Sequence, residues 1–246
     1  MIESLAYTLI GINMLAYVMV RLRPRLYQTT LYKPMLTNIK LSLMPLVILM
    51  AAGTAFVVFQ GLSTYFGGHT VFWWASILVA GAGFLIWLLM LPNAGYLVTE
   101  LNLNHREQDK TEVPLWYDII GILTLAMSGV MNMCFNVFIV QFMIAIFVRG
   151  ATRDSTFIFD FVSWIVMAVL MLLSSFGIYL GRYIRFNSWD VRHPVQFIKK
   201  LSVHFKEKGT GKNCALFIVF HTLFFVVFYR ATVGVVLSEM INSITF

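Results

Sequence analysis

Carboxylates, arginines and amides gather in two short stretches of a chain that is otherwise strongly apolar. The first stretch covers residues 91–118 and the second covers residues 174–190. Half-buried charges need partners, and arginine offers a planar fork that fits a carboxylate or a phosphate. Opposite charges are available across the two stretches, namely Glu100, Asp118 and Asp190 against Arg182 and Arg185. We therefore expect the two stretches to meet in the folded protein.

A pocket built from these stretches would bind an anionic headgroup or a small solute. Asn93 follows a proline and is predicted to cap a short helix that runs to Glu100, in which Tyr96 and Glu100 would share a face. Arginines would hold anions, and amides would orient them. The candidate binding residues are Asn93, Tyr96, Glu100, Asp118, Arg182, Arg185, Asn187 and Asp190. A structural network of salt bridges and caps that locks the helices together is the alternative.

Metal and catalytic chemistry fit the residue spacing less well. Glu100, His105, Asp118 and Asp190 offer oxygen and nitrogen ligands. However, Glu100 and His105 are five residues apart, not the four of a helical metal-binding pair. A b-type haem would need facing histidines, and His221 alone lies deep in an apolar stretch. We expect no metal, no cofactor and no catalytic residue.

The composition is that of a membrane protein. Hydrophobic residues make up 59% of the 246 residues and charged residues 12%, whereas soluble domains carry about 25% charged residues. This excludes a soluble enzyme and a nucleic-acid-binding module. Because about 20 apolar residues cross a bilayer as a helix, we predict an all-α, polytopic membrane helix bundle in one domain over residues 1–246. Its six spans fall at about 2–20, 41–62, 71–91, 119–148, 161–181 and 214–237.

The distribution of positive charge predicts how the bundle is oriented. Residues 119–148 contain no charge in 30 positions, which is too short for two spans, so we predict one tilted or kinked helix with Gly129 as the kink site. Of the 18 Lys and Arg residues, 15 then fall in the connections after spans one, three and five. The positive-inside rule puts these connections in the cytoplasm and both termini outside.

A separate amphipathic segment follows the fifth span. Val195, Ile198, Leu201 and Phe205 recur at helical spacing, and lysines occupy the other faces. This pattern predicts a short helix at about 194–208 that lies on the inner leaflet and is held there by anionic lipids. Plain anchoring is the simpler interpretation of this helix, and lipid sensing is the alternative.

Polar residues also occur inside the predicted spans. Ser128, Asn132 and Asn136 are four residues apart and form one stripe on the fourth span, with Gln141 slightly off it. Such side chains commonly join helices through hydrogen bonds, and they can instead line the path of a solute. Arg230 in the sixth span is expected to reach the outer interface, where acidic residues could pair with it.

Several motifs in the polar stretches carry a family resemblance. In chain order they are Asn38 and Pro45, Asn93-Ala94-x-Tyr96-Leu97-x-Thr99, Pro114-Leu115-Trp116-Tyr117-Asp118, Gly177-Ile178-Tyr179-Leu180-Gly181-Arg182 and Asn187-Ser188-Trp189-Asp190. With these motifs the chain resembles a family of bacterial multi-pass membrane proteins catalogued as domain of unknown function 1361. The resemblance implies a bacterial inner-membrane protein and no known activity. Its pattern often has histidine where this chain has Leu103, which further weakens a metal site.

The sequence favours a non-enzymatic membrane protein that binds or transports a small solute or lipid through a charged pocket on the cytoplasmic side. One alternative is a membrane enzyme that acts on a lipid headgroup, with Glu100 or Asp190 as general base. Another is a structural or assembly subunit of a membrane complex. The expected partners are the lipid bilayer, anionic lipids at the inner leaflet and, for a subunit, another membrane protein. No nucleic-acid partner is expected.

Overall fold

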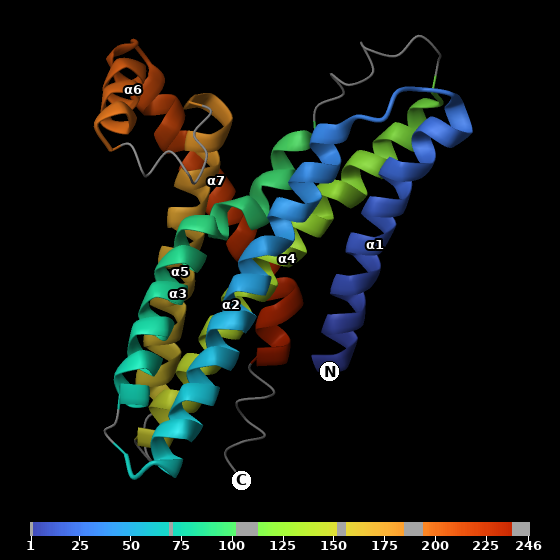
Figure 1. The fold of residues 1–246 in the computed structure, drawn as a ribbon. Coiled ribbons are helices and arrows are strands. Elements are labelled where there is room, and N and C mark those ends of the chain that lie inside the picture. Colours follow the sequence, from blue (N-terminus) through green and yellow to red (C-terminus); the bar gives the residue numbers. More distant parts are fainter. Residues whose placement is uncertain (1, 69–70, 102–112, 152–155, 185–193, 238–246) are drawn as a thin grey trace.

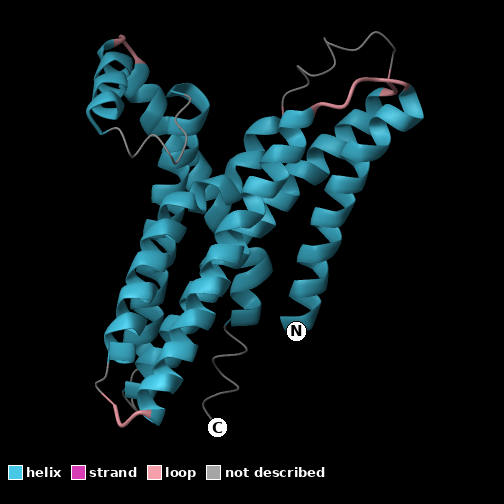
Figure 2. Ribbon diagram, in the orientation of Figure 1, coloured by secondary structure: helices cyan, strands magenta, loops and turns pink. Residues whose placement is uncertain are grey.

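The computed structural model describes residues 2–68, 71–101, 113–151, 156–184 and 194–237. Within these ranges, six helices are long and apolar enough to cross a membrane, which confirms the predicted helix bundle. They are α1 (Ile2–Tyr27), α2 (Lys33–Tyr65), α3 (Val71–Gly95), α4 (Leu115–Ala151), α5 (Thr156–Tyr179) and α7 (Thr210–Tyr229). The described part of the chain contains no strand (Figure 2).

Shorter helical segments extend or connect these six helices. They are the 3-10 helix η1 (Tyr96–Glu100) after α3, the π-helix η3 (Leu180–Ile184) after α5, the α-helix α6 (Pro194–Lys206) and the π-helix η5 (Arg230–Gly234) after α7. α6 occupies the place of the predicted amphipathic segment and ends two residues earlier. Its position on the inner leaflet stays a prediction.

Local sequence signals explain the turn between α1 and α2. Gln28 directly follows α1 and has a φ of +53°, a left-handed conformation that does not continue a helix. Pro34 then stands in the first turn of α2, where the missing N–H of proline removes no hydrogen bond. Pro45 and Pro92 lie inside α2 and α3, and neighbouring helices make such prolines tolerable in a membrane.

α4 is the central helix of the bundle. In its most apolar stretch 78% of the residues are buried inside the protein, against at most 39% in any other span. The helix has 37 residues and runs obliquely through the bundle in Figure 1. A perpendicular span needs only about 20 residues, so the length of α4 fits a tilted helix. The prediction of one long helix over residues 119–148 is therefore confirmed.

Gly129 allows a close contact in the middle of α4. The helix continues through this residue without interruption. A Cβ atom there would lie 2.7 Å from the Leu97 Cβ and 3.1 Å from the Ala94 carbonyl oxygen. The glycine therefore lets the end of α3 and the start of η1 pack directly on the α4 backbone. Close approach of the neighbouring backbone is thus one structural reason for glycine at this position, and the kink stays a prediction.

The end of α3 is wedged between α4, α5 and α7. A Cβ atom on Gly177 of α5 would come within 2.3 Å of the Pro92 ring, and one on Gly95 would come within 2.8 Å of Phe225 on α7. Leu97 is fully buried at the start of η1. The two polar stretches of the sequence thus begin where α3 and α5 touch, as we expect from their composition.

Asparagines inside the bundle join α1, α2 and α4. Asn13 and Asn132 exchange two amide hydrogen bonds of 2.8 and 3.0 Å. Asn132 also donates to the Ser42 hydroxyl at 2.8 Å, and Ser42 donates in turn to the Ala94 carbonyl oxygen at 2.8 Å. Asn132 and Ser42 are almost fully buried and Asn13 is 8% exposed. Their amide and hydroxyl groups therefore find their partners within the protein, as groups in a bilayer must.

Two more polar residues of α4, Asn136 and Gln141, are also bonded to neighbouring helices. The Trp87 indole N–H donates to the Asn136 side-chain oxygen at 2.9 Å, and the Asn136 amide donates to the Asn132 carbonyl oxygen. Gln141 donates to the Ser163 hydroxyl at 2.7 Å and accepts a hydrogen bond from the Tyr229 hydroxyl. Asn132, Asn136 and Gln141 thus bond α4 to its neighbours, which fits the first of the two interpretations that the sequence leaves open. Ser128 donates to the Leu125 carbonyl oxygen of α4 itself.

The bundle has two different ends. The turn between α1 and α2, the end of α3 with η1, and α6 lie at one end, while the first turn of α1 and the end of η5 lie toward the other (Figure 1). Both terminal spans thus leave the bundle on the same side, as six spans require. Arg230 lies with its guanidinium 5.2 Å from the Trp164 ring centre. The sequence offers Glu3 and Asp160 as its acidic partners. Glu3 is exposed near the start of α1, and the side chain of Asp160 lies outside the described residues.

Candidate functional site

A groove opens between α2, α3, α5 and α6 at the end of the bundle that carries α6. It has a volume of about 410 Å³. Polar side chains line it from α2, α3 and η1, namely Asn38, Asn93 and Tyr96. The remaining walls are apolar and are formed by Leu41, Leu88, Leu89, Pro92, Leu173, Phe176, Gly177, Leu180, Gly181 and Phe197. Two of the predicted binding residues, Asn93 and Tyr96, therefore line one groove.

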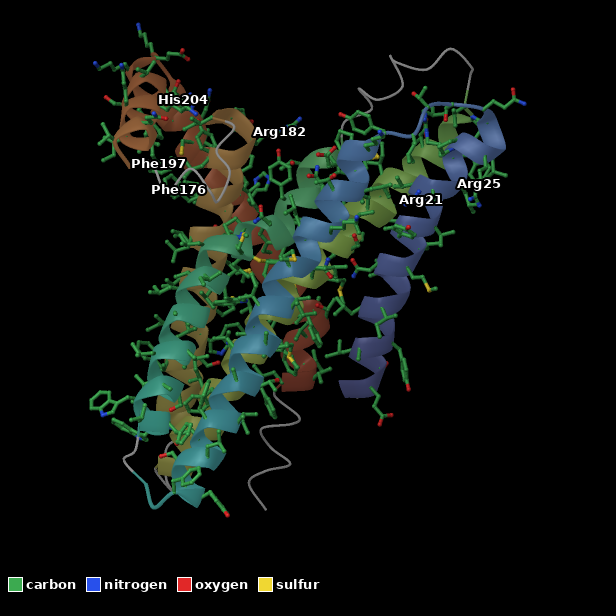
Figure 3. All side chains as sticks on the ribbon, viewed as in Figure 1. Arg21, Arg25, Phe176, Arg182, Phe197 and His204 are labelled. Carbon is green, nitrogen blue, oxygen red and sulfur yellow. The ribbon has the colours of Figure 1, made fainter. Side chains whose placement is uncertain are left out.

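The polar side of this groove is fixed by Glu100. Asn38 donates an amide hydrogen bond of 2.9 Å to the Glu100 carboxylate, across 62 residues of sequence. Arg182 lies near enough to this carboxylate to interact with its charge. The charges of Glu100, in the first polar stretch, and Arg182, in the second, thus interact with each other. Arg182 itself is exposed and projects at the same end of the bundle as α6 (Figure 3).

Asn93 has a different local role from the predicted one. The sequence suggests that Asn93 caps a short helix running to Glu100, but α3 continues through Asn93 to Gly95 and the short helix η1 begins at Tyr96. The Asn93 amide donates to the Met90 sulfur at 3.2 Å. The cap prediction is therefore wrong, because the helix that precedes Asn93 does not end at Pro92.

Asp118 has its partner on the first helix. Arg23 donates to both carboxylate oxygens of Asp118, at 2.8 and 3.2 Å, in the bidentate geometry that arginine favours. Both residues are buried. Together with Tyr117, whose hydroxyl donates to the Met19 carbonyl oxygen, this ion pair ties α1 to the start of α4. The sequence analysis predicts that Asp118 pairs with Arg182 or Arg185, whereas in the structure its ion-pair partner is Arg23 of α1.

A small cavity of about 30 Å³ adjoins this ion pair, with Met19, Arg23, Tyr32 and Asp118 among its lining residues. Asp118 is thus built into the contact between α1 and α4, whereas the groove is lined from α2, α3, α5 and α6. Three further predicted binding residues lie outside the described residues, namely Arg185, Asn187 and Asp190. His105, one of the possible metal ligands considered above, also lies outside them.

The groove is open along its apolar side. Leu41 is 36% exposed, Leu89 50% and Leu173 42%, although all three are leucines in helices that can span a membrane. In a bilayer these exposed faces contact hydrocarbon rather than water. Phe197 reaches the groove from α6 and Phe176 from α5, and Figure 3 shows both near the junction of these helices. A molecule in the groove would therefore touch lipid chains on one side and polar groups on the other.

Comparison with protein families adds one positive finding. The model of the family described as "Protein of unknown function (DUF1361)" matches residues 37–228, which run from the first turns of α2 to the end of α7. The chain belongs to this family. No curated protein and no solved structure matches it. The family match covers every residue that lines the groove.

Some residues that matter in this DUF1361 protein could not be singled out as site residues from sequence. Asn38 belongs to the motifs that carry the family resemblance, but nothing in its spacing predicts a bond to Glu100. Arg23 is one of several basic residues after the first span. In the sequence, Phe176 and Phe197 do not differ from the many other apolar residues of predicted helices. All four gain their roles from contacts between distant helices, which no local pattern encodes.

Proposed function

We propose that this protein is a multi-pass protein of the bacterial cell membrane that binds a single anionic phospholipid in the groove between α2, α3, α5 and α6. The headgroup would lie beside Asn38, Asn93 and Tyr96, and an acyl chain would lie along the leucines of the apolar wall. The lipid is drawn from the cytoplasmic leaflet, because the positive-inside rule orients this end of the bundle toward the cytoplasm.

The observation that carries the proposal is the division of the groove into a polar side and an apolar side that is open to the bilayer. Ligand pockets are mostly apolar, with a few polar groups that fix orientation, and a volume of about 410 Å³ lies within their usual range of about 300–1,000 Å³. An amphiphile satisfies both sides at once. A small polar solute would leave the leucine wall unused.

Charge favours an anionic headgroup. Arg182 is exposed next to the polar side of the groove. Arginine presents two N–H donors to a phosphate in one plane. Basic residues near a membrane surface attract anionic lipids with about 1 kcal/mol each. Asn38 and Asn93 supply amide groups for the glycerol and ester oxygens.

Binding rather than passage through the bundle is the function that the geometry favours. The Asn132 side chain, which could have lined a solute path, bonds to Asn13 of α1 and Ser42 of α2. The Asn136 oxygen accepts from Trp87 of α3, and its amide donates to the Asn132 carbonyl oxygen within α4. Polar groups that are satisfied by one another gain little from a passing solute. The groove lies at one end of the bundle and faces the bilayer sideways, which suits a lipid that enters from the leaflet.

A bulky residue in the apolar wall tests this proposal. Leu173→Trp puts an indole into the groove, whereas Leu172→Trp puts the same group on a neighbouring exposed position of α5 that does not line it. Binding of phosphatidylglycerol to the purified protein, measured by native mass spectrometry, is expected to weaken about tenfold in Leu173→Trp, which is about 1.4 kcal/mol. Leu172→Trp should bind like the parent protein.

Equal phosphatidylglycerol binding in both tryptophan variants and the parent would contradict the groove as the site. Arg182→Gln gives a second readout in the same assay. It is expected to reduce binding of phosphatidylglycerol more than binding of zwitterionic phosphatidylcholine, because the choline cation of the latter offsets the phosphate charge that attracts the guanidinium.

A further inference from the structure

A second pocket lies on another face of α6. It has a volume of about 550 Å³ and is bounded by α6 on one side and by the π-helix η3 on the other. From η3 it takes Tyr183 and Ile184. From α6 and the residue that follows it, the pocket takes Gln196, Lys199, Lys200, Val203, His204 and Glu207. These positions recur at three- and four-residue intervals, so they form one continuous face of the helix.

The opposite face of α6 is apolar and exposed. Val195 is 79% exposed, Ile198 62% and Phe205 37%. At 100° per residue, Ile198 and Phe205 stand almost opposite the centre of the pocket face. An exposed apolar face on a basic helix next to membrane spans lies against the bilayer. With α6 on the inner leaflet, as the sequence predicts, its pocket face is turned away from the hydrocarbon and toward water.

Aromatic contacts hold the pocket walls together. Tyr179 and Tyr183 stack with their ring centres 4.6 Å apart, and the Tyr179 hydroxyl lies 2.9 Å from Nε2 of His204. Tyr183 also meets the edge of Phe217 on α7. α6 is thus attached to α5 through His204, and η3 is attached to α7 through Tyr183. The π-helical turn that carries Tyr183 is a rare geometry that is frequent at functional sites.

The pocket presents more donors and positive charge than acceptors. The two ammonium groups of Lys199 and Lys200, the His204 imidazole, the Gln196 amide and the Tyr183 hydroxyl can all donate a hydrogen bond. Glu207 contributes the single carboxylate among the residues that line it. Charge-assisted donors of this kind suit phosphate, which accepts several hydrogen bonds at once.

We propose that this pocket binds the phosphate group of a phosphate ester, at a site separate from the lipid groove. η3 and α6 contribute different residues to the two sites, since Leu180, Gly181 and Phe197 line the groove whereas Tyr183, Ile184 and Lys200 line the pocket. The orientation of α6 favours a water-soluble ester over a lipid headgroup. The proposal does not depend on lipid binding in the groove.

The test compares two pairs of lysines that carry the same charge. Lys199→Gln with Lys200→Gln removes two charges from the pocket, and Lys206→Gln with Lys208→Gln removes two charges from nearby exposed positions that do not line it. The full chain in phosphatidylcholine nanodiscs is titrated with glycerol 3-phosphate by calorimetry. The pocket pair is expected to raise Kd at least tenfold, and the control pair less than twofold.

Each outcome decides the proposal. Equal weakening in both pairs would show that general surface charge attracts the ester, and absence of binding to the parent protein would also overturn the site. A second arm replaces the ester with nanodiscs that contain phosphatidylglycerol. If only that arm is sensitive to the pocket pair, the bound phosphate is that of a lipid headgroup. Leu173→Trp, which blocks the groove, should leave the Kd for glycerol 3-phosphate unchanged.

Discussion

Asparagines play opposite parts in the middle of the bundle and at its α6 end. Asn132, at the centre of α4, is almost completely buried and bonds to Asn13 and Ser42. Asn38 and Asn93 lie along an open groove, where they are half-buried beside a volume that a ligand can fill. The residue type is the same in both regions. What differs is whether the surrounding helices already fill the space beside the amide.

This difference separates residues that stabilise the bundle from residues that can bind a ligand. A buried polar group in a bilayer must be bonded within the protein, so its replacement lowers stability. A polar group beside an open groove can exchange its partners for those of a ligand. Substitutions in the middle of the bundle should therefore change the free energy of unfolding, and substitutions around the groove should change ligand binding.

The largest loss of stability is expected at the ion pair between α1 and α4. Asp118→Asn or Arg23→Gln leaves one buried charge without its bidentate partner, and such a change typically lowers the free energy of unfolding by about 3–5 kcal/mol. The free energy can be measured by SDS-induced unfolding in mixed micelles. Arg25→Gln, an exposed arginine on the same helix, is the matched control and should change it by less than about 0.5 kcal/mol.

A double substitution sharpens this test. Arg23→Met with Asp118→Leu removes both charges and should recover most of the lost stability, because a hydrophobic pair avoids the desolvation of two ions. If the double variant were as unstable as the single variants added together, the two residues would not act as a pair. Phosphatidylglycerol binding by the double variant should equal that of the parent protein.

A smaller loss is expected from the asparagine network. Asn132→Ala removes three side-chain hydrogen bonds, to Asn13 twice and to Ser42 once. At about 0.6 kcal/mol for each hydrogen bond between membrane helices, the free energy of unfolding should fall by about 2 kcal/mol. Lipid binding should be unaffected. A variant of normal stability that fails to bind lipid would contradict the division between the two regions.

Composition and charge were sufficient to predict the architecture. The number of long apolar stretches predicts six spans. The uncharged stretch around Asn132 is too short for two helices, and two helices there would put the basic segment near Lys199 outside the cell, so one long central helix is predicted. The structure confirms the six spans and the one long helix. These properties are encoded locally, because each helix must contain enough apolar residues to cross a bilayer whatever its neighbours are.

The partners of individual polar residues could not be predicted in the same way. Asp118 has several arginines at its end of the bundle, and the packing of α1 on α4 selects Arg23. Likewise the predicted cap at Asn93 failed because α3 continues past Pro92, where Gly177 of α5 makes room for the proline ring. Both outcomes depend on how helices from distant parts of the sequence approach one another.

The most direct test of lipid binding in the groove is photo-crosslinking in bilayers. A phosphatidylglycerol with a photoreactive group on its acyl chain, close to the glycerol, is irradiated with the reconstituted protein, and the labelled residues are mapped by mass spectrometry. We predict labelling concentrated in residues 88–96 and 173–181 that is lost in Leu173→Trp and is displaced by unlabelled phosphatidylglycerol. Labelling spread evenly over exposed positions such as Val57 and Leu78, and unchanged in Leu173→Trp, would contradict a lipid-binding groove.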